Sequence, residues 1–166
     1  DNIIVRNQKM YFDVIYKNNT NKQDYKIENI SFSMLGLHNV QNALASVSIA
    51  LELRIKPEII KLALKNFNGV QRRFQLINTY NNTKIIDDYG HHPEEIKAAL
   101  SATRLIADKS KVLAIFQPHR YSRLKNHFEE FCSCFNDADE VVLLNVYAAG
   151  EKKLANTTNI DLEHGR

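Results

Sequence analysis

The sequence predicts an α/β protein whose second half forms a parallel, doubly wound sheet. Beyond residue 83, three apolar runs alternate with two amphipathic helical patterns, in the order strand, helix, strand, helix, strand. Such an order implies right-handed crossovers between parallel strands. Short alternating segments and two further helical patterns precede it. We therefore expect two domains, covering residues 1–67 and 68–166, and the second holds fewer strands than a complete sheet of this kind.

The first domain combines strands with helices. Residues 11–16 and 27–35 alternate apolar and polar side chains as strands do, with a turn rich in Asn, Thr and Lys between them. A helix follows from Asn39, which can cap its N-terminus. A second helix begins at Pro57, a favoured first-turn residue, and fades near 66–69, where we place the boundary. The first helix has apolar residues at helical spacing: Val40, Ala43, Leu44, Val47 and Leu51.

The second domain is periodic. We expect strands at 76–80, 84–88, 112–116 and 141–146, with a turn at Asn81 and Asn82. The run at 112–116 is continuously apolar, as in strands buried on both faces of a sheet. Two helices complete the pattern. They cover 93–107, with an inner face of Ile96, Ala99, Leu100, Thr103 and Ala107, and 122–136, with Leu124, Phe128, Phe131 and Phe135.

Composition narrows the class of protein. Hydrophobic residues make up 44% and charged residues 25%, as in soluble globular proteins. The net charge of +3 is spread along the chain and suits a small anionic ligand as well as a nucleic acid. No apolar run approaches the ~20 residues of a membrane span, and no signal peptide is visible, so we expect a cytoplasmic protein. The chain starts at Asp1 and ends on a polar stretch, which suggests a fragment.

The two cysteines, Cys132 and Cys134, stand two residues apart inside a helical pattern. Side chains at that spacing point to different sides of a helix. We therefore expect neither a disulfide nor a metal-binding pair.

Two polar stretches at strand ends hold most of the groups that titrate or bind anions. Parallel α/β sheets bind ligands outside the carboxyl ends of their strands. The first stretch contains Asp87, Asp88, His91 and His92, directly before Pro93. These side chains can form an acid–base pair or a metal cluster, or a polar loop in which an aspartate caps the next helix. Adjacent histidines favour a functional site, but the spacing matches no established metal signature.

The second stretch contains His119, Arg120 and Arg123. Arginine presents a planar fork of donors that matches carboxylates and phosphates. Ser122 opens the next helix, and its free N–H groups and dipole add to the preference for anions. The alternative is a solvated loop with surface arginines. The two stretches together favour an anion site.

A third candidate lies at the start of the first helix. Asn39 and Asn42 can project from one side of its first turn, and an amide offers the donor and acceptor that an adenine edge requires. The spacing alone favours a helix cap and a solvated asparagine. Arg72 and Arg73 can contact a phosphate or merely solubilise a linker. The five glycines form no Gly-x-x-x-x-Gly-Lys-Ser/Thr phosphate loop, so a triphosphate cradle would lie outside this sequence.

Five segments together resemble the Mur ligases, the ATP-dependent amide-bond enzymes of peptidoglycan synthesis. The first segment is shared across the family and the later ones are more specific. The later ones resemble most the member that joins L-alanine to UDP-N-acetylmuramate. A relative that attaches recycled tripeptide to the same sugar nucleotide shares the histidine segment but usually lacks the run at 117–121. The segments are Gly36–Ala43, Gly69–Gln75, Asp87–Pro93, Phe116–Arg123 and Val146–Glu151.

The resemblance implies three domains, of which residues 1–67 end the central ATPase and the rest is a truncated, Rossmann-like C-terminal domain. ATP activates the muramoyl carboxylate as an acyl phosphate, which the amine of L-alanine attacks. The resemblance places His38, Asn39 and Asn42 at the adenine, Arg73 at the phosphates and Asp88 at the ribose. It places Tyr89, His91, His119, Arg120 and Arg123 around the L-alanine, with Arg120 and His91 as catalytic residues.

The same resemblance implies that ATP and Mg²⁺ are needed, with the metal ligands, the phosphate loop and the UDP-sugar domain outside this sequence. We therefore expect the chain alone to be inactive. We expect UDP-N-acetylmuramate and L-alanine as partners, and neither nucleic acid nor membrane. The alternatives are the tripeptide ligase and a non-catalytic module that binds nucleotides or anions. A nucleic-acid-binding domain is disfavoured, because the basic residues form no stripe with interleaved aromatics.

Overall fold

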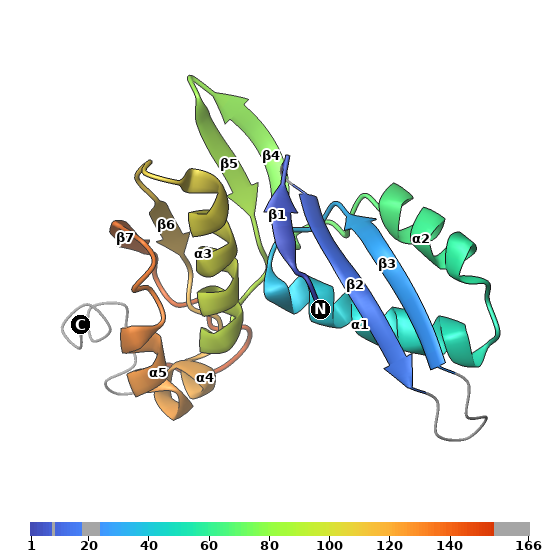
Figure 1. The fold of residues 1–166 in the computed structure, drawn as a ribbon. Coiled ribbons are helices and arrows are strands. Elements are labelled where there is room, and N and C mark those ends of the chain that lie inside the picture. The colour runs from blue at the N-terminus through green and yellow to red at the C-terminus, as the bar shows by residue number, and fades with distance from the viewer. Residues whose placement is uncertain (8, 18–23, 155–166) are drawn as a thin grey trace. The chain divides into compact units, whose positions relative to one another are not determined.

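The computed structural model describes residues 1–7, 9–17 and 24–154, and its elements are drawn in Figure 1. The chain divides into two compact units, Asp1–Asp88 and Tyr89–Arg166. We call them unit 1 and unit 2 and describe each by itself. This division by compactness falls beyond the domain boundary expected near residue 67, which stays a prediction.

Unit 1 contains an antiparallel sheet of three strands, β1 (Ile4–Arg6), β2 (Lys9–Lys17) and β3 (Asp24–Phe32), in that order. Alternate residues of β2 are buried, namely Met10, Phe12 and Val14, which confirms the strand expected there. The second predicted strand is confirmed, although β3 ends at Phe32 rather than at residue 35. The polar turn predicted between them falls largely on 18–23, outside the described residues.

Two helices accompany this sheet, α1 (Leu37–Glu52) and α2 (Pro57–Asn66). The second matches its predicted bounds. The first starts earlier than predicted, because Gly36, with φ of 100°, turns the chain directly into the helix. Asn39 therefore does not cap α1. Its buried side chain donates instead to the Leu35 carbonyl oxygen at 2.7 Å. The apolar stripe predicted for α1 is buried, except for Leu44, which is exposed.

A hairpin follows, formed by β4 (Gln75–Tyr80) and β5 (Thr83–Asp87). Asn81 and Asn82, the predicted turn residues, both have positive φ, as a tight two-residue hairpin turn requires. We expected β5 to join a parallel sheet. It pairs antiparallel with β4 instead, because so short a turn can return the chain only in the opposite direction.

Unit 2 holds the parallel pairing that the sequence predicts. Strands β6 (Leu113–Phe116) and β7 (Glu140–Leu143) are parallel neighbours, and α4 (Tyr121–Asn126) and α5 (Phe128–Ser133) form the crossover between them. Helix α3 (Pro93–Ala107) has its predicted bounds. The single helix expected over 122–136 is wrong, since the chain leaves helical geometry at His127, where φ is −125° and ψ is 31°. Unit 2 is thus α/β, as predicted.

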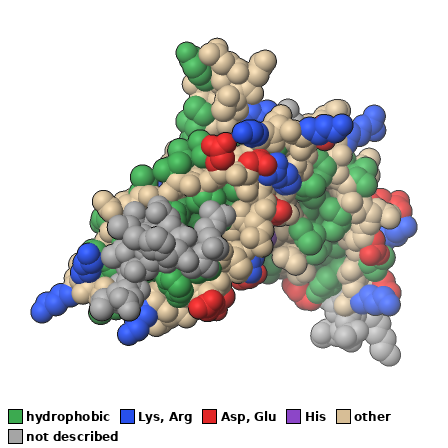
Figure 2. Space-filling model, turned by 90° about the vertical axis from the view of Figure 1, so that its left-hand side faces the viewer, with side chains coloured by type: hydrophobic (Ala, Val, Ile, Leu, Met, Phe, Trp, Pro, Cys, Tyr) green, Lys and Arg blue, Asp and Glu red, His purple; other side chains and the backbone are tan. Residues whose placement is uncertain are grey.

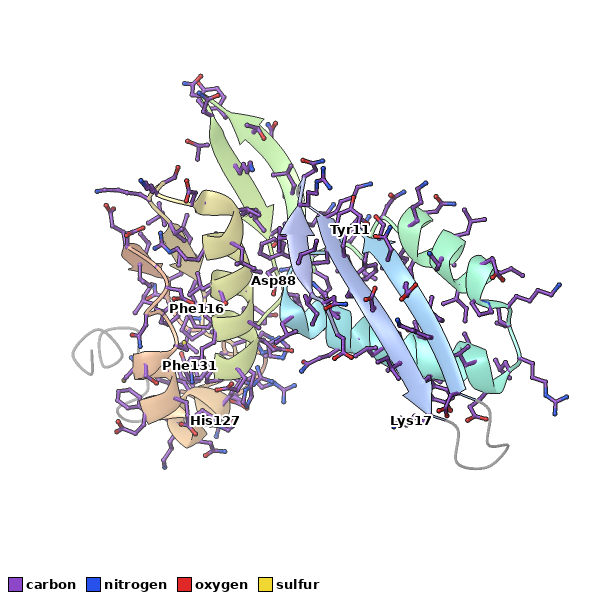
Figure 3. The ribbon with its side chains drawn as sticks, viewed as in Figure 1. Tyr11, Lys17, Asp88, Phe116, His127 and Phe131 are labelled. Carbon is purple, nitrogen blue, oxygen red and sulfur yellow. The ribbon has the colours of Figure 1, made fainter. Side chains whose placement is uncertain are left out.

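The core of unit 2 lies on one face of this sheet. The ring centroid of Phe116 lies 5.8 Å from that of Phe131 and 5.4 Å from that of Phe135, and Figure 3 labels the first two. The expectation that β6 is buried on both faces is wrong, because Leu113 and Ile115 are 55% and 66% exposed. Hydrophobic side chains also reach the surface in the view of Figure 2. The buried members of this core are Ile96, Leu100, Val112, Phe116, Leu124, Phe131, Cys134 and Phe135.

Both cysteines are free thiols. Among the described residues, every helix is too short or too polar to span a bilayer.

Candidate functional site

The predicted site residues divide cleanly between the two units. Every residue predicted at the ATP lies in unit 1, and every residue predicted at the amino acid lies in unit 2. We call them the unit 1 cluster and the unit 2 cluster. The unit 1 cluster comprises His38, Asn39, Asn42, Arg73 and Asp88, and the unit 2 cluster comprises Tyr89, His91, His119, Arg120 and Arg123.

In the unit 1 cluster, Asp88 directly follows β5, and its position is labelled in Figure 3. Its Oδ2 accepts the Phe74 backbone N–H at 2.8 Å. Phe74 and Arg72 both have positive φ, and the Arg73 N–H donates to the Val70 carbonyl oxygen at 3.2 Å. The carboxylate thus holds the compact turn that positions Arg73.

The charges of Arg73 and Asp88 also act on the pKa of His38. Burial lowers it below its usual range, and the charge of Arg73 lowers it further, whereas the charge of Asp88 opposes the shift. His38, Arg73 and Asp88 therefore belong to one electrostatic environment.

The two asparagines do not project together. Asn39 is buried, with its amide nitrogen committed to Leu35, whereas Asn42 is exposed. Arg72 forms an ion pair with Asp87, with 3.4 Å between Nε and Oδ2. Both side chains are largely exposed, so this ion pair adds little stability.

The unit 2 cluster lies at the carboxyl ends of β6 and β7. Beyond both strands the two chains stay side by side, because His119 forms a parallel bridge with Tyr147. The Tyr147 N–H donates to the Pro118 carbonyl oxygen at 2.8 Å, and the Arg120 N–H donates to the Tyr147 carbonyl oxygen at 2.9 Å. This is the edge at which parallel sheets bind ligands.

Four rings contact one another at this edge. The His119 ring centroid lies 5.9 Å from that of His91 and 5.3 Å from that of Tyr147. The Tyr89 ring packs edge-on against His91, with 5.1 Å between centroids. The structure therefore brings both predicted histidines together. Sequence reasoning missed Tyr147 as a site residue, although it stands within one of the family-like segments.

The loop before α3 is held by Glu95. Its Oε2 accepts the N–H groups of His91 and His92, at 3.0 and 3.1 Å. The His92 side chain completes a capping box at the start of α3. The alternative reading, in which an aspartate caps this helix, is wrong. The His91 Nδ1 lies 2.9 Å from the Tyr89 carbonyl oxygen, which orients the ring.

Arg123 fixes His119. Its Nη1 donates to the His119 carbonyl oxygen at 3.0 Å and lies 3.3 Å from the His119 Nδ1. Burial lowers the pKa of His119, and the charges of Arg123, His91 and Arg120 lower it further. The imidazole is therefore mostly neutral at pH 7 and able to accept a proton.

The start of α4 is already occupied by a carboxylate. Glu151 accepts the Ser122 N–H on Oε2 at 2.9 Å and the Ser122 hydroxyl on Oε1 at 2.6 Å. These hydrogen bonds, with a smaller contribution from the charge of Arg120, lower the pKa of Glu151. The expectation that this N-terminus leaves its N–H groups for an external anion is thus wrong for Ser122. Sequence reasoning missed the role of Glu151, since no local pattern links residues so far apart.

The described residues hold no group of three or more His, Cys, Asp or Glu side chains able to bind a metal ion. The histidines of the unit 2 cluster instead lie among arginines, and the charges of those arginines disfavour a cation. This arrangement suits an anionic ligand and a proton acceptor. The donor set of the unit 2 cluster therefore does not fit Mg²⁺.

A family model described as "Mur ligase, glutamate ligase domain" matches residues 72–163. The chain belongs to the Mur ligase family. This Mur ligase chain is 49% identical over 153 residues to a UDP-N-acetylmuramate–L-alanine ligase of Bartonella henselae, covering 92% of the chain and 32% of that relative. It thus spans about a third of the length of the curated relatives it matches.

Solved structures agree with this assignment of the Mur ligase chain. A UDP-N-acetylmuramate–alanine ligase from Thermotoga maritima matches with a TM-score of 0.67 and 30% identity, over 84% of this chain and 30% of that one. A murein peptide ligase from Psychrobacter arcticus matches with a TM-score of 0.56 and 25% identity, over 82% of this chain and 27% of that one.

Proposed function

We propose that the whole protein containing this sequence joins L-alanine to UDP-N-acetylmuramate with ATP, in the synthesis of peptidoglycan precursors in the cytoplasm. The observation that supports it most is the unit 2 cluster, where two histidines and two arginines meet at the carboxyl edge of a parallel pair of strands. The identity of 49% to a relative named for this reaction supports the substrates.

In this proposal, Arg120 and Arg123 provide positive charge where negative charge develops. Amide formation through an acyl phosphate places charge on the transferred phosphoryl group and on the tetrahedral carbon, and preplaced cations stabilise both. The exposed Arg120 side chain is the one available to a substrate carboxylate or phosphoryl group. Arg123 is partly committed to His119, so its main effect is on that histidine.

The attacking amine must lose a proton. His119 is suited to accept one, because its lowered pKa keeps it mostly neutral at pH 7. His91 lies beside it and is the other candidate for this role. Tyr89 and Tyr147 line the same cluster and would limit the size of the amino acid.

The unit 1 cluster would hold the nucleotide. We assign Asn42 and His38 to the adenine, Arg73 to the phosphates and Asp88 to the ribose. The Asn39 amide nitrogen donates one of its two N–H groups to Leu35, which leaves the other N–H group and the carbonyl oxygen for the adenine. ATP supplies the phosphoryl group that activates the carboxylate, and we expect the Mg²⁺ ligands and the phosphate loop to lie outside this sequence. The 166-residue chain alone is therefore expected to be inactive.

Phosphate release by the whole protein tests the proposal. The protein is given ATP, Mg²⁺ and UDP-N-acetylmuramate, with L-alanine present or omitted. Release that depends on L-alanine supports the ligase. Absence of such release from a folded protein that binds ATP would overturn it. The same assay on the 166-residue chain should give no L-alanine-dependent release, and turnover there would overturn the expectation of inactivity.

A second candidate is a ligase that attaches recycled peptide to the same sugar nucleotide. The structural match to a murein peptide ligase favours it as the alternative. The discriminating arm replaces L-alanine with the recycled tripeptide. Release with tripeptide but not with L-alanine would select this candidate.

A further inference from the structure

The backbone of Arg120 is held in an unusual conformation. Its φ is 71° and its ψ is 133°, and residues other than glycine rarely adopt positive φ. Such a conformation persists only when the surrounding structure determines it. Arg120 is also the residue from which α4 starts, and its own side chain makes no capping hydrogen bond.

Two contacts hold the backbone on either side of this residue. The Arg120 N–H donates to the Tyr147 carbonyl oxygen, which fixes the chain entering Arg120. The carboxylate of Glu151 accepts both the N–H and the hydroxyl of Ser122, which fixes the chain leaving it. We call the second contact the Ser122–Glu151 contact. It replaces the missing local cap of α4.

Glu151 reaches this place because the chain turns sharply after Tyr147. Ala149 and Gly150 have positive φ, and the Glu151 N–H donates to the Ala148 carbonyl oxygen at 3.0 Å. The segment that begins at Tyr147 therefore holds two points: its backbone binds the Arg120 N–H, and its Glu151 carboxylate binds Ser122. The anionic form of Glu151 is favoured, since its donors lower its pKa.

We infer that Glu151 is a positioning residue, which holds the Arg120 guanidinium and the first turn of α4 in the geometry needed for ligation. This inference rests on the proposed function. Misplacing a reacting group by about 1 Å can cost on the order of 100-fold in rate. Glu151 acts through hydrogen bonds to Ser122, so their geometry matters more than its charge.

Three variants of the whole protein distinguish the effect of the Glu151 hydrogen bonds from the effect of its charge and from a general loss of stability. Glu151→Ala removes both hydrogen bonds. Glu151→Gln removes the charge but can keep both, because the Ser122 hydroxyl can rotate to accept from the new amide. Asp139→Ala is the matched control. Asp139 also accepts one backbone N–H and one side-chain donor, from Val112 and Arg104, at the opposite end of the strands.

The measurement is phosphate release at varied L-alanine and at varied ATP. Glu151→Ala should lower kcat/KM for L-alanine by about 10- to 100-fold, with KM for ATP unchanged. Glu151→Gln should stay within about threefold of the wild type, and Asp139→Ala should melt at a lower temperature with unchanged kinetic constants. Wild-type kinetics in Glu151→Ala would overturn the inference. An equal loss in Glu151→Gln would also overturn it, because charge would then be the cause.

Hydrogen exchange separates this inference from the proposed function. The backbone amides of Ser122 and Leu124 should exchange faster in Glu151→Ala than in the wild type, and Glu151→Gln should remain protected. This readout needs no turnover. If the wild type lacks L-alanine-dependent release, the proposed function fails while exchange still decides whether Glu151 fixes this turn. Unchanged exchange in Glu151→Ala would overturn the positioning role.

Discussion

The imidazole rings of His91 and His119 have their centroids 5.9 Å apart and are inclined by 43°. His91 belongs to the loop before α3, and His119 follows β6. Two stretches that are separate in the sequence therefore share one site within unit 2. The charge of the His91 ring contributes to the lowered pKa of His119. Replacing His91 should therefore change the pH at which His119 titrates.

Removing the charge of Arg123 should raise the pKa of His119. Burial is the largest cause of its lowered pKa, and Arg123 is the next. We expect the His119 ring in Arg123→Met to titrate at higher pH than in the wild type, as measured by NMR of the imidazole protons. Lys125→Met is the control, because it removes one exposed charge from the same helix. Equal titration of His119 in the wild type and Arg123→Met would contradict the assignment.

The stability of the folded protein should depend on His38 and His119 at mildly acidic pH. Both have pKa values below the ordinary 6.5, so the unfolded chain binds more protons between the two values. Their contribution to stability is present above about pH 6.5 and is lost as the pH falls through the lowered folded values. The double variant His38→Gln, His119→Gln should lose less stability than the wild type between pH 7 and 5.5 in urea titrations. An unchanged loss would count against both shifts.

Arg120 should affect the amino-acid step and leave nucleotide binding intact. Arg120→Ala should lower kcat/KM for L-alanine by about 100- to 1,000-fold, the size seen when one preplaced donor is removed from a transition state. Arg120→Lys should recover only part of the lost kcat/KM, because an ammonium group lacks the planar fork of donors. Steady-state kinetics and calorimetric ATP titration measure the two effects. A similar loss in ATP affinity would place Arg120 at the nucleotide instead.

Asp88, unlike Arg120, should affect the binding of ATP. Asp88→Asn keeps an oxygen that can accept the Phe74 N–H, so the turn should survive. It loses the charge proposed to bind the ribose hydroxyls, and we expect ATP to bind about 10-fold more weakly, since hydrogen bonds to charged groups contribute about 1.5–3 kcal/mol. Calorimetric titration with ATP measures this. Unchanged affinity would remove Asp88 from the nucleotide site.

Arg104 should matter for stability alone. Its guanidinium donates to the Asp137 carbonyl oxygen, the Ser110 carbonyl oxygen and the Asp139 carboxylate, at 2.9, 3.2 and 2.9 Å. Arg104→Ala should lower the free energy of unfolding by about 1–3 kcal/mol. Lys111→Ala is the control, because its ion pair with Glu140 is well exposed and should contribute little. Equal losses in the two variants would contradict this account.

The elements that the sequence predicted best are those with a local start signal. Pro57 and Pro93 begin α2 and α3 at the predicted residues, because proline suits the first turn and little else in a helix. The break at His127 has no such signal. The apolar stripe of Leu124, Phe131 and Phe135 continues across it at helical spacing, and no proline or glycine interrupts the chain.

Site residues, like helices, were predicted where the sequence carries a local signal. Strand ends and titratable side chains indicated the unit 2 cluster, since these are local properties of the sequence, whereas the family resemblance indicated most of the unit 1 cluster. The residues that could not be predicted depend on contacts between segments that are distant in the sequence. Tyr147 reaches His119 only because β6 and β7 run parallel. Asn39 was misread as a cap because the left-handed backbone of Gly36 starts the helix before it.

The Ser122–Glu151 contact has a consequence for recombination between relatives of this family. Any chimaera with a single crossover inside 123–150 takes Ser122 from one parent and Glu151 from the other. Parents that differ at either position would produce mismatched partners, although each parent alone is self-consistent. Libraries built by exchanging segments should therefore inherit 122–151 as one block.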